Sequence, residues 1–343
     1  MAQFGLSVNI PKMKSDLLRY KIEYDQWFLE SDLHNSGYVA ETVGMLTEKG
    51  WTYEKDGALW LNTTELLKQK YMAEGKTREQ VDKLDLKDDV LRRANGFYTY
   101  FAADIAYHRN KLEKRGFSKA INIWGADHHG HVARLQAALD GLGLDGSHRL
   151  VVVLMQLVNL LQDGQPVRMS KRSGKAIALH DLLDEISVDA ARYFFNSRSS
   201  TSPLDFDLDL AVREDSDNPV YYVQYAHARI CSMVRKMAEE GVAVPAAAAV
   251  DATLLAEPEE KALLKALSEL PEEIRLAARD YDPSRINRYL VELAGSFHRF
   301  YNTCRCMVDN AALRDARLKL ADTTRAVIAD GLKLLGVSAP EKM

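Results

Sequence analysis

The chain divides into two halves that differ in the spacing of their apolar residues. Through about residue 160, short apolar runs alternate with charged segments in which apolar residues recur at helical spacing. This alternation of strands and helices favours a parallel α/β sheet. After about residue 185, long amphipathic patterns dominate and predict a bundle of helices.

Several elements of the first half have local signals. The apolar spacing predicts helix within residues 13–31. Residues 51–63 are predicted to form a hairpin that turns at Asp56-Gly57, a pair that tolerates the positive φ angles of a tight turn. Residues 120–124 predict a buried strand, and a glycine turn then leads into a helix that ends at Gly141 to Gly143.

The second half contains four stretches of helical pattern, at residues 218–241, 257–280, 283–307 and 317–336. The alanine-rich segment 241–254 is predicted to be a solvent-facing linker after the first of them. At roughly 100 to 200 residues per domain, a chain of 343 residues corresponds to two domains, which we place at residues 1–200 and 201–343.

Charge and cysteine content narrow the class of protein. The net charge of −4 and the pI of about 6.2 give no global basic field for nucleic acid, although a local patch of Lys and Arg would suffice. The three cysteines are too few and oddly numbered for a disulfide framework, so we expect reduced thiols in a cytoplasmic protein. Cys304 and Cys306 have no second pair of ligands nearby, and no metal site is expected. No apolar run approaches the ~18 residues of a membrane span, so no membrane association is expected.

A ring and a carboxylate lie one helical turn apart at Tyr100 and Asp104. Ligands of an open α/β sheet bind at the carboxyl ends of its strands, and this pair could hold a cationic substrate there. The alternative is an aromatic core residue beside a solvated carboxylate, and the spacing alone favours that alternative.

Two further segments could bind an anion. Residues 125–131, "GADHHGH", follow the strand directly. A metal site is not expected from them, because successive residues cannot all face one metal ion. Binding of an anion or an adenine ring by backbone N–H groups and imidazoles is the better interpretation. Structural capping of the helix is the equal alternative. The basic loop 165–175, "QPVRMSKRSGK", places Lys171 among small residues that allow close approach to phosphates. Taken alone, such a loop is more often a solvated turn.

The combination of motifs is familiar. "RMSKRSG" resembles the KMSKS loop of class I aminoacyl-tRNA synthetases, and "YFAADIAYH", "WGADHHGHVARLQAAL", "VDAARYFFNSRSS" and "NPVYYVQYAHARI" resemble bacterial arginyl-tRNA synthetases. "ALRDARLKLA" is similar to the DALR-type anticodon-binding domain, and the resemblance extends from about residue 10 to the last residue. It implies a partial Rossmann-like α/β catalytic domain in residues 1–200 and an all-α helical-bundle anticodon-binding domain in residues 201–343.

The resemblance implies arginine–tRNA ligase activity, with arginine, ATP with Mg²⁺ and tRNA(Arg) as substrates and no tightly bound cofactor. In this family the arginine carboxylate attacks the α-phosphate of ATP, and the acyl group then passes to the tRNA. The implied catalytic residues are Arg168, Ser170 and Lys171. Lys171 would neutralise charge on the leaving pyrophosphate, and Met169 would seat the loop. Arg168 stands where the motif has its first Lys.

Binding residues follow from the same resemblance. The arginine pocket is expected at Tyr100, Asp104 and His128, where the carboxylate would pair with the guanidinium. ATP contacts are expected at Asp127, His128, Met169 and Lys171. Contacts to tRNA are expected at Tyr221, Gln224, Tyr225, Arg229 and Met343. These rings and donors suit an unstacked anticodon loop, but tyrosines at such spacing in a bundle are usually core residues.

The chain also departs from the family. Complete members begin with an N-terminal domain and carry an H-x-G-H motif that binds ATP phosphates; the sequence "HHGH" at 128–131 has those letters but belongs to the later GADHHGH stretch. We therefore expect an exposed sheet edge and apolar surface, and incomplete catalysis. Three interpretations remain open for what we expect to be a monomer: a truncated arginine–tRNA ligase, which is favoured; a tRNA-binding module; and one subunit of a split synthetase whose N-terminal half is another chain.

Overall fold

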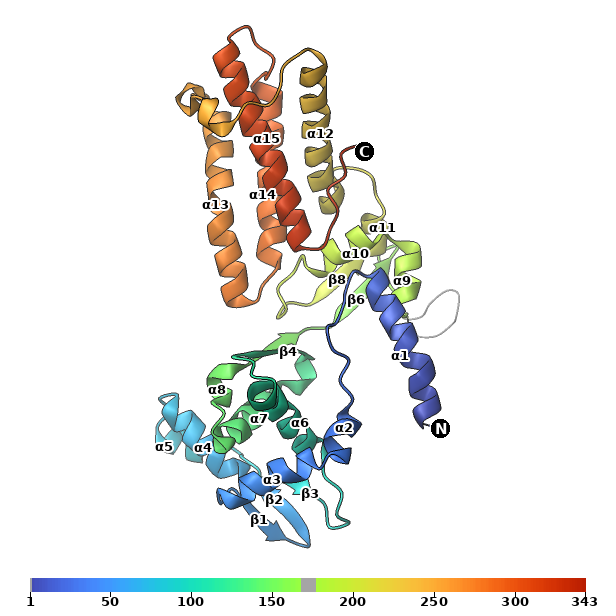
Figure 1. The fold of residues 1–343 in the computed structure, drawn as a ribbon, viewed down its shortest axis with the longest axis vertical. Coiled ribbons are helices and arrows are strands. Elements are labelled where there is room, and N and C mark those ends of the chain that lie inside the picture. Colours follow the sequence, from blue (N-terminus) through green and yellow to red (C-terminus); the bar gives the residue numbers. More distant parts are fainter. Residues whose placement is uncertain (1, 168–176) are drawn as a thin grey trace. The chain divides into compact units, whose positions relative to one another are not determined.

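The computed structural model describes residues 2–167 and 177–343, which form two compact units (Figure 1). The inserted unit is Tyr24–Gln156, and the helical unit combines Met1–Glu23 with Leu157–Met343. The division at residue 200 concerns function and stays a prediction, whereas the compact units divide the chain after residues 23 and 156. Within the described residues, every helix is too short or too polar to cross a membrane.

The inserted unit contains an antiparallel sheet of the order β1-β2-β3, made of β1 (Thr52–Lys55), β2 (Ala58–Leu61) and β3 (Asp89–Arg92). Its helices are α2 (Glu30–Asn35), α3 (Tyr38–Glu48), α4 (Thr63–Ala73), α5 (Arg78–Asp82), α6 (Tyr100–Arg109), α7 (His129–Leu142) and α8 (Gly146–Arg149). The predicted hairpin is confirmed, because Asp56 and Gly57 take φ angles of 52° and 73° between β1 and β2.

A parallel pair of strands supports the chemistry of the inserted unit. β4 (Ala120–Gly125) pairs in parallel with β5 (Leu150–Met155), and Ala120 lies opposite Leu150. The chain between the two strands forms α7 and α8. The strand predicted at residues 120–124 is confirmed, but its predicted burial is wrong, because Ile121 and Ile123 are exposed on one face. The end of the following helix is confirmed, since Gly143 is the cap of α7 at φ +83°. This βαβ unit brings the end of β4 and the start of α7 to one place.

The helix predicted within residues 13–31 is only partly correct. α1 (Ala2–Arg19) ends early, and helix returns only with α2. Lys21 takes a φ of +60°, and the Arg192 guanidinium donates a hydrogen bond to the Tyr20 carbonyl over 2.8 Å. A contact to a residue far along the chain therefore overrides the local helical pattern.

The helical unit contains a small sheet and a four-helix bundle. The sheet order is β7-β6-β8, with β6 (Val158–Gln162) parallel to β8 (Leu204–Asp207) and antiparallel to β7 (Gln165–Pro166). The helices are α1, α9 (Leu179–Glu185), α10 (Val188–Phe195), α11 (Leu208–Ala211), α12 (Pro219–Glu239), α13 (Pro258–Asp280), α14 (Ser284–Thr303) and α15 (Ala311–Leu334). The predicted helical second half is confirmed, and the linker within 241–254 holds only two short 3₁₀ turns.

A buried ion pair ties α13 to α15. Arg317 Nε lies 2.6 Å from Glu260 Oε1, with Glu260 fully buried and the Arg317 side chain 10% exposed. Two further atoms of the pair are also hydrogen-bonded: Glu260 Oε2 accepts from the Glu257 N–H at 2.9 Å, and Arg317 Nη1 donates to the Arg305 carbonyl at 2.8 Å. The pair therefore also fixes the segment that follows α14.

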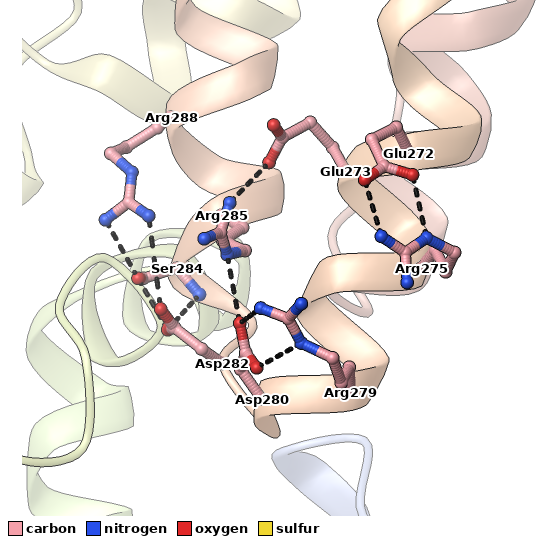
Figure 2. A network of polar contacts seen from close by, with 9 residues as sticks. All are labelled: Glu272, Glu273, Arg275, Arg279, Asp280, Asp282, Ser284, Arg285 and Arg288. Carbon is pink, nitrogen blue, oxygen red and sulfur yellow. Dashed lines mark hydrogen bonds and ion pairs between the residues drawn. The ribbon is translucent and has the colours of Figure 1, made fainter.

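The turn between α13 and α14 is held by ionic contacts (Figure 2). Asp282 holds the first residue of α14, because its Oδ1 accepts from the Ser284 N–H at 3.1 Å and from the Ser284 hydroxyl at 2.6 Å. Arg285 reaches Glu273 and Asp280, at 3.3 and 3.8 Å. The other members of the network are Glu272, Arg275, Arg279 and Arg288. Its four arginines and four carboxylates balance, so the turn presents no net charge.

Candidate functional site

The first turn of α6 presents a ring and a carboxylate. The Thr99 hydroxyl caps the helix, accepting from the Ala102 N–H and donating to the Val90 carbonyl at 2.7 Å. Tyr100 is 82% exposed, so it is not the core residue that the alternative interpretation required. The side chain of Asp104, one turn later, is 40% exposed and accessible to a ligand.

A histidine from α7 holds the Asp104 carboxylate. His131 Nε2 lies 3.0 Å from Asp104 Oδ2, and the rings of Phe101 and Trp124 lie 5.3 and 5.5 Å from the imidazole. No local signal in the sequence links His131 to Asp104. The two residues are 27 positions apart, so no local periodicity could connect them.

A buried hydrogen-bonded chain supports the turn of α6 that carries Asp104. His108 Nδ1 donates to the Asp104 carbonyl at 2.7 Å, and His108 Nε2 accepts from the Asn122 amide at 2.6 Å. Lys111, in the π-helical turn Asn110–Lys114, donates to Asn122 Oδ1 at 3.2 Å. Burial lowers the pKa of His108 to about 4, which keeps the imidazole neutral in these roles, and lowers the pKa of Lys111 to about 8.

Asp127 and His128 lie in a 3₁₀ turn (Ala126–His128) between β4 and α7. Their side chains are 81% and 59% exposed, and the imidazole ring lies 6.1 Å from Trp124. Asp127 Oδ1 would lie 2.5 Å from a Cβ at Gly125, so the exposed Asp127 side chain lies directly against the backbone at the end of β4. No side chain caps α7 at His128, and the His129 N–H donates to the Ala126 carbonyl within the 3₁₀ turn. Anion binding at this helix start stays a prediction.

The two predicted segments of the inserted unit therefore converge. His131 contacts Asp104 directly, and Trp124 lies beside both His128 and His131. The arrangement combines an exposed ring, a partly exposed carboxylate and a helix N-terminus without a side-chain cap. Chemically, it can bind a cation beside an anion. Across the described residues there is no group of three or more His, Cys, Asp or Glu side chains suited to a metal ion.

The outer face of the β4–β5 pair is apolar and exposed. Ile121 and Ile123 are 51% and 71% exposed, while Asn122 between them is buried. Met155 continues this face on β5 at 38% exposure. Parallel strands are ordinarily covered on both faces, so this surface matches the apolar surface expected from the sequence.

The residues predicted for the basic loop, Arg168, Met169, Ser170 and Lys171, lie outside the described residues. The strands before the loop are described: Val167 donates its N–H to the Leu160 carbonyl at 2.8 Å, and the β6–β7 hairpin turns at Asp163. Asp209 accepts the Asp163 N–H at 2.5 Å, which joins this turn to α11. The roles of the four loop residues stay predictions.

A cavity of about 870 Å³ opens in the helical unit between α12 and the end of α14. Arg229 lies over two rings, 4.2 Å from the centroid of Tyr301 and 5.7 Å from that of Tyr225. Lys236 and Arg305 add two more cations to the lining. The other lining residues are Ala228, Ser232, Met233, Met237, Glu240, Asn302, Cys304, Cys306, Met307 and Met343. Rings, cations and methionines in one hollow suit a planar, anionic ligand such as an unstacked nucleotide.

The structure brings together three of the five residues predicted to bind tRNA. Tyr225, Arg229 and Met343 line the cavity. Tyr221 stacks on Tyr225, with ring centroids 6.2 Å apart, but does not line the cavity. Gln224 is buried, and its amide donates to the Ser338 carbonyl and to Asp189, so it faces the C-terminal segment. Other lining residues, such as Tyr301 and Arg305, were not predicted to bind tRNA. They lie in α14 and in the segment after it, within the sequence "FHRFYNTCRCM".

The βαβ unit and the helical bundle both lie within regions that match known protein families. A model described as "tRNA synthetases class I (R), catalytic domain" matches residues 19–205, and one described as "DALR anticodon binding domain" matches residues 223–343. The chain belongs to the arginine branch of the class I tRNA synthetase family.

Similar proteins agree with this family. The arginine–tRNA ligases of Ruminiclostridium cellulolyticum and Caldanaerobacter subterraneus are each 51% identical, over 99% and 100% of this chain. The chain spans 57% and 58% of their lengths. The structure of an arginyl-tRNA synthetase from Campylobacter jejuni matches with a TM-score of 0.81 at 35% identity, over 96% of this chain and 67% of that one. A Mycobacterium tuberculosis methionyl-tRNA synthetase, at 14% identity and a TM-score of 0.68, shares the fold; the match covers 94% of this chain and 76% of that one.

Proposed function

We propose that this chain carries the arginine-binding and anticodon-binding parts of an arginine–tRNA ligase, which acts on arginine, ATP with Mg²⁺ and tRNA(Arg) in the cytoplasm. The observation that supports this most is the convergence at α6 and α7, where His131 holds the Asp104 carboxylate 3.0 Å away beside the exposed ring of Tyr100. The family match gives this geometry its chemical context.

In this proposal, the guanidinium of arginine donates to the Asp104 carboxylate while Tyr100 packs against its plane. Because His131 occupies one side of Oδ2, the guanidinium approaches the remaining lone pairs of the carboxylate. His128 would lie beside the bound arginine and ATP. Asp127 would contact the adenosine, and the N–H groups at the start of α7 would face phosphate oxygens.

The reaction requires the arginine carboxylate to attack the α-phosphorus of ATP. A bond forms between the carboxylate oxygen and phosphorus, and the bond to pyrophosphate breaks. We assign Lys171 to the charge that develops on pyrophosphate, with Arg168, Met169 and Ser170 shaping the loop around it. The acyl group then passes to the terminal ribose of the tRNA, whose anticodon would lie against Tyr221, Tyr225, Arg229 and Met343.

A second candidate function is that of one component of a two-chain enzyme. The apolar face formed by Ile121, Ile123 and Met155 favours this candidate, because a completing polypeptide would cover it. That polypeptide would correspond to the part of the relatives' length that this chain does not span. A third candidate is a monomeric tRNA-binding module, which the cavity of the helical unit alone would support.

The test is charging of arginine-accepting tRNA with labelled arginine, ATP and Mg²⁺, with Lys171→Ala as the matched control. If this chain is sufficient for catalysis, we expect it to charge the tRNA by itself and the Lys171→Ala control not to. Charging only after addition of the remaining segment of a relative would establish the two-chain enzyme. Binding of tRNA without charging in either mixture would establish the RNA-binding module, and neither activity would refute all three candidates.

A further inference from the structure

The segment after α15 runs beside α12 (Figure 1). Its last residue, Met343, lines the cavity of the helical unit. Gln224 donates to the Ser338 carbonyl at 2.9 Å, and one turn later His227 Nδ1 donates to the Pro340 carbonyl at 2.9 Å. Met343 then lines the cavity together with residues of the next turns of α12. The segment therefore advances along the helix in a defined register.

Asp189, near the start of α10, is the centre of the contacts that hold this segment. Its Oδ1 accepts from Lys21 Nζ at 2.8 Å, and its Oδ2 accepts from Gln224 Nε2 at 3.1 Å. The Ser338 N–H donates to the same oxygen at 3.1 Å, and so does the Ser338 hydroxyl. Burial alone would raise the pKa of Asp189, but the contacts with Lys21 and Ser338 outweigh it and hold the pKa below its ordinary value. The carboxylate thus stays ionised and accepts every bond.

The direction in which the segment leaves α15 is also fixed. Gly336 takes a φ of +70°, and a Cβ there would lie 2.3 Å from Arg192 Nε, so only glycine fits. Arg192 Nε donates to the Leu335 carbonyl at 2.8 Å, and Val337 is buried in the core. The segment therefore arrives at Ser338 with little freedom.

We infer that Asp189, Gln224 and Ser338 form a clamp that sets the register of the C-terminal segment and thereby seats Met343 in the cavity. The inference deepens the proposed function and rests on it for the ligand, an unstacked base of the anticodon loop. Gln224 and Asp189 act as positioning residues: they are bonded to the segment, and the segment carries Met343 to the ligand.

The first measurement does not require RNA. In protein labelled with ¹³C at the Met methyl groups, the Met343 signal is assigned by its loss in Met343→Leu. Met343 lines the cavity while 51% exposed, so its methyl signal in the unmodified chain reflects its contacts with the cavity wall. We expect Gln224→Leu and Asp189→Asn each to move this signal to the position of a Met in an unstructured peptide. The matched control Glu272→Gln, in the network at the α13–α14 turn, should leave it unmoved. A Met343 signal unchanged in both clamp variants, with helical circular dichroism intact, would overturn the inference.

The second measurement is a double-mutant cycle on binding of an anticodon stem-loop of arginine tRNA. Met343→Ala and Asp189→Asn are each expected to weaken binding by about tenfold, since one base contact is worth ~1–3 kcal/mol. The double variant should be no weaker than the single ones, because both remove the same contact. Losses that multiply would show that Asp189 acts elsewhere and overturn the inference. Failure of the unmodified chain to bind RNA would refute the proposed RNA ligand, and the methyl signal would still decide the clamp.

Discussion

Replacing Arg317 with Met should destabilise the helical unit far more than removing both members of its ion pair. The replacement leaves the Glu260 carboxylate fully buried with only the Glu257 N–H as a donor. An uncompensated buried charge of this kind costs about 3–5 kcal/mol. In the double variant Glu260→Leu/Arg317→Met no charge remains buried, and the loss of stability should fall to about 1–2 kcal/mol. Much of that loss comes from the Glu257 N–H at the start of α13, which loses the Glu260 carboxylate as its acceptor. The rest comes from the Arg305 carbonyl, which loses its donor.

The positions of the tryptophans make the assay specific to one unit. All four, Trp27, Trp51, Trp60 and Trp124, lie in the inserted unit. In a urea titration, tryptophan fluorescence therefore reports the inserted unit, whereas circular dichroism at 222 nm is dominated by the long helices of the helical unit. We expect Arg317→Met to lower the dichroism midpoint and to leave the fluorescence midpoint unchanged. A single variant no less stable than the double would refute the reasoning, because the buried charge would then carry no penalty.

Three further predictions use other sites. Gly331→Ala should destabilise the helical unit by about 1–3 kcal/mol in the same titration, because the new Cβ would lie 2.7 Å from a methyl of Leu290; an unchanged midpoint would contradict this. The inserted unit should lose about 2 kcal/mol between pH 7.5 and 5, because His108 has a pKa of about 4 when folded and ~6.5 when unfolded, so its contribution is present above 6.5 and lost toward 4. The fluorescence midpoint should show this loss, and His108→Gln should remove it. Asp104→Asn should weaken arginine binding by about 10- to 100-fold in calorimetry, with Glu54→Gln as an exposed control.

Local signals in the sequence were sufficient for most elements. The hairpin at Asp56-Gly57 and the glycine end of α7 depend on the backbone angles of one or two residues, so the sequence predicts them directly. The amphipathic helices of the bundle are predictable for the same reason, since their apolar face repeats within a few residues. The early end of α1 is not predictable from the local pattern, because it depends on Arg192, 172 positions from the carbonyl that it contacts.

The candidate site was predictable where its residues are adjacent in sequence and not where separate segments meet. Tyr100 and Asp104 share a helix, and their spacing suggested a common role. The His131 contact with Asp104 arises only when α7 folds back beside α6. Likewise, Gln224 belongs to a motif rich in tyrosines, yet its partner Ser338 lies 114 positions away, so its direction could not be read locally.

The insertion of residues 24–156 within the helical unit has a consequence for the order of events during synthesis. Lys21 bonds with Asp189 and with Gly336, which follow it by 168 and 315 positions. The ribosome therefore synthesises the whole inserted unit before it synthesises the partners of Lys21. Until then the first 23 residues cannot form their native contacts. Contacts of such long sequence separation form slowly. Refolding should accordingly be biphasic, with the tryptophan fluorescence recovered before the last of the helical ellipticity. During synthesis, the slow phase should set how long the nascent chain stays bound to chaperones.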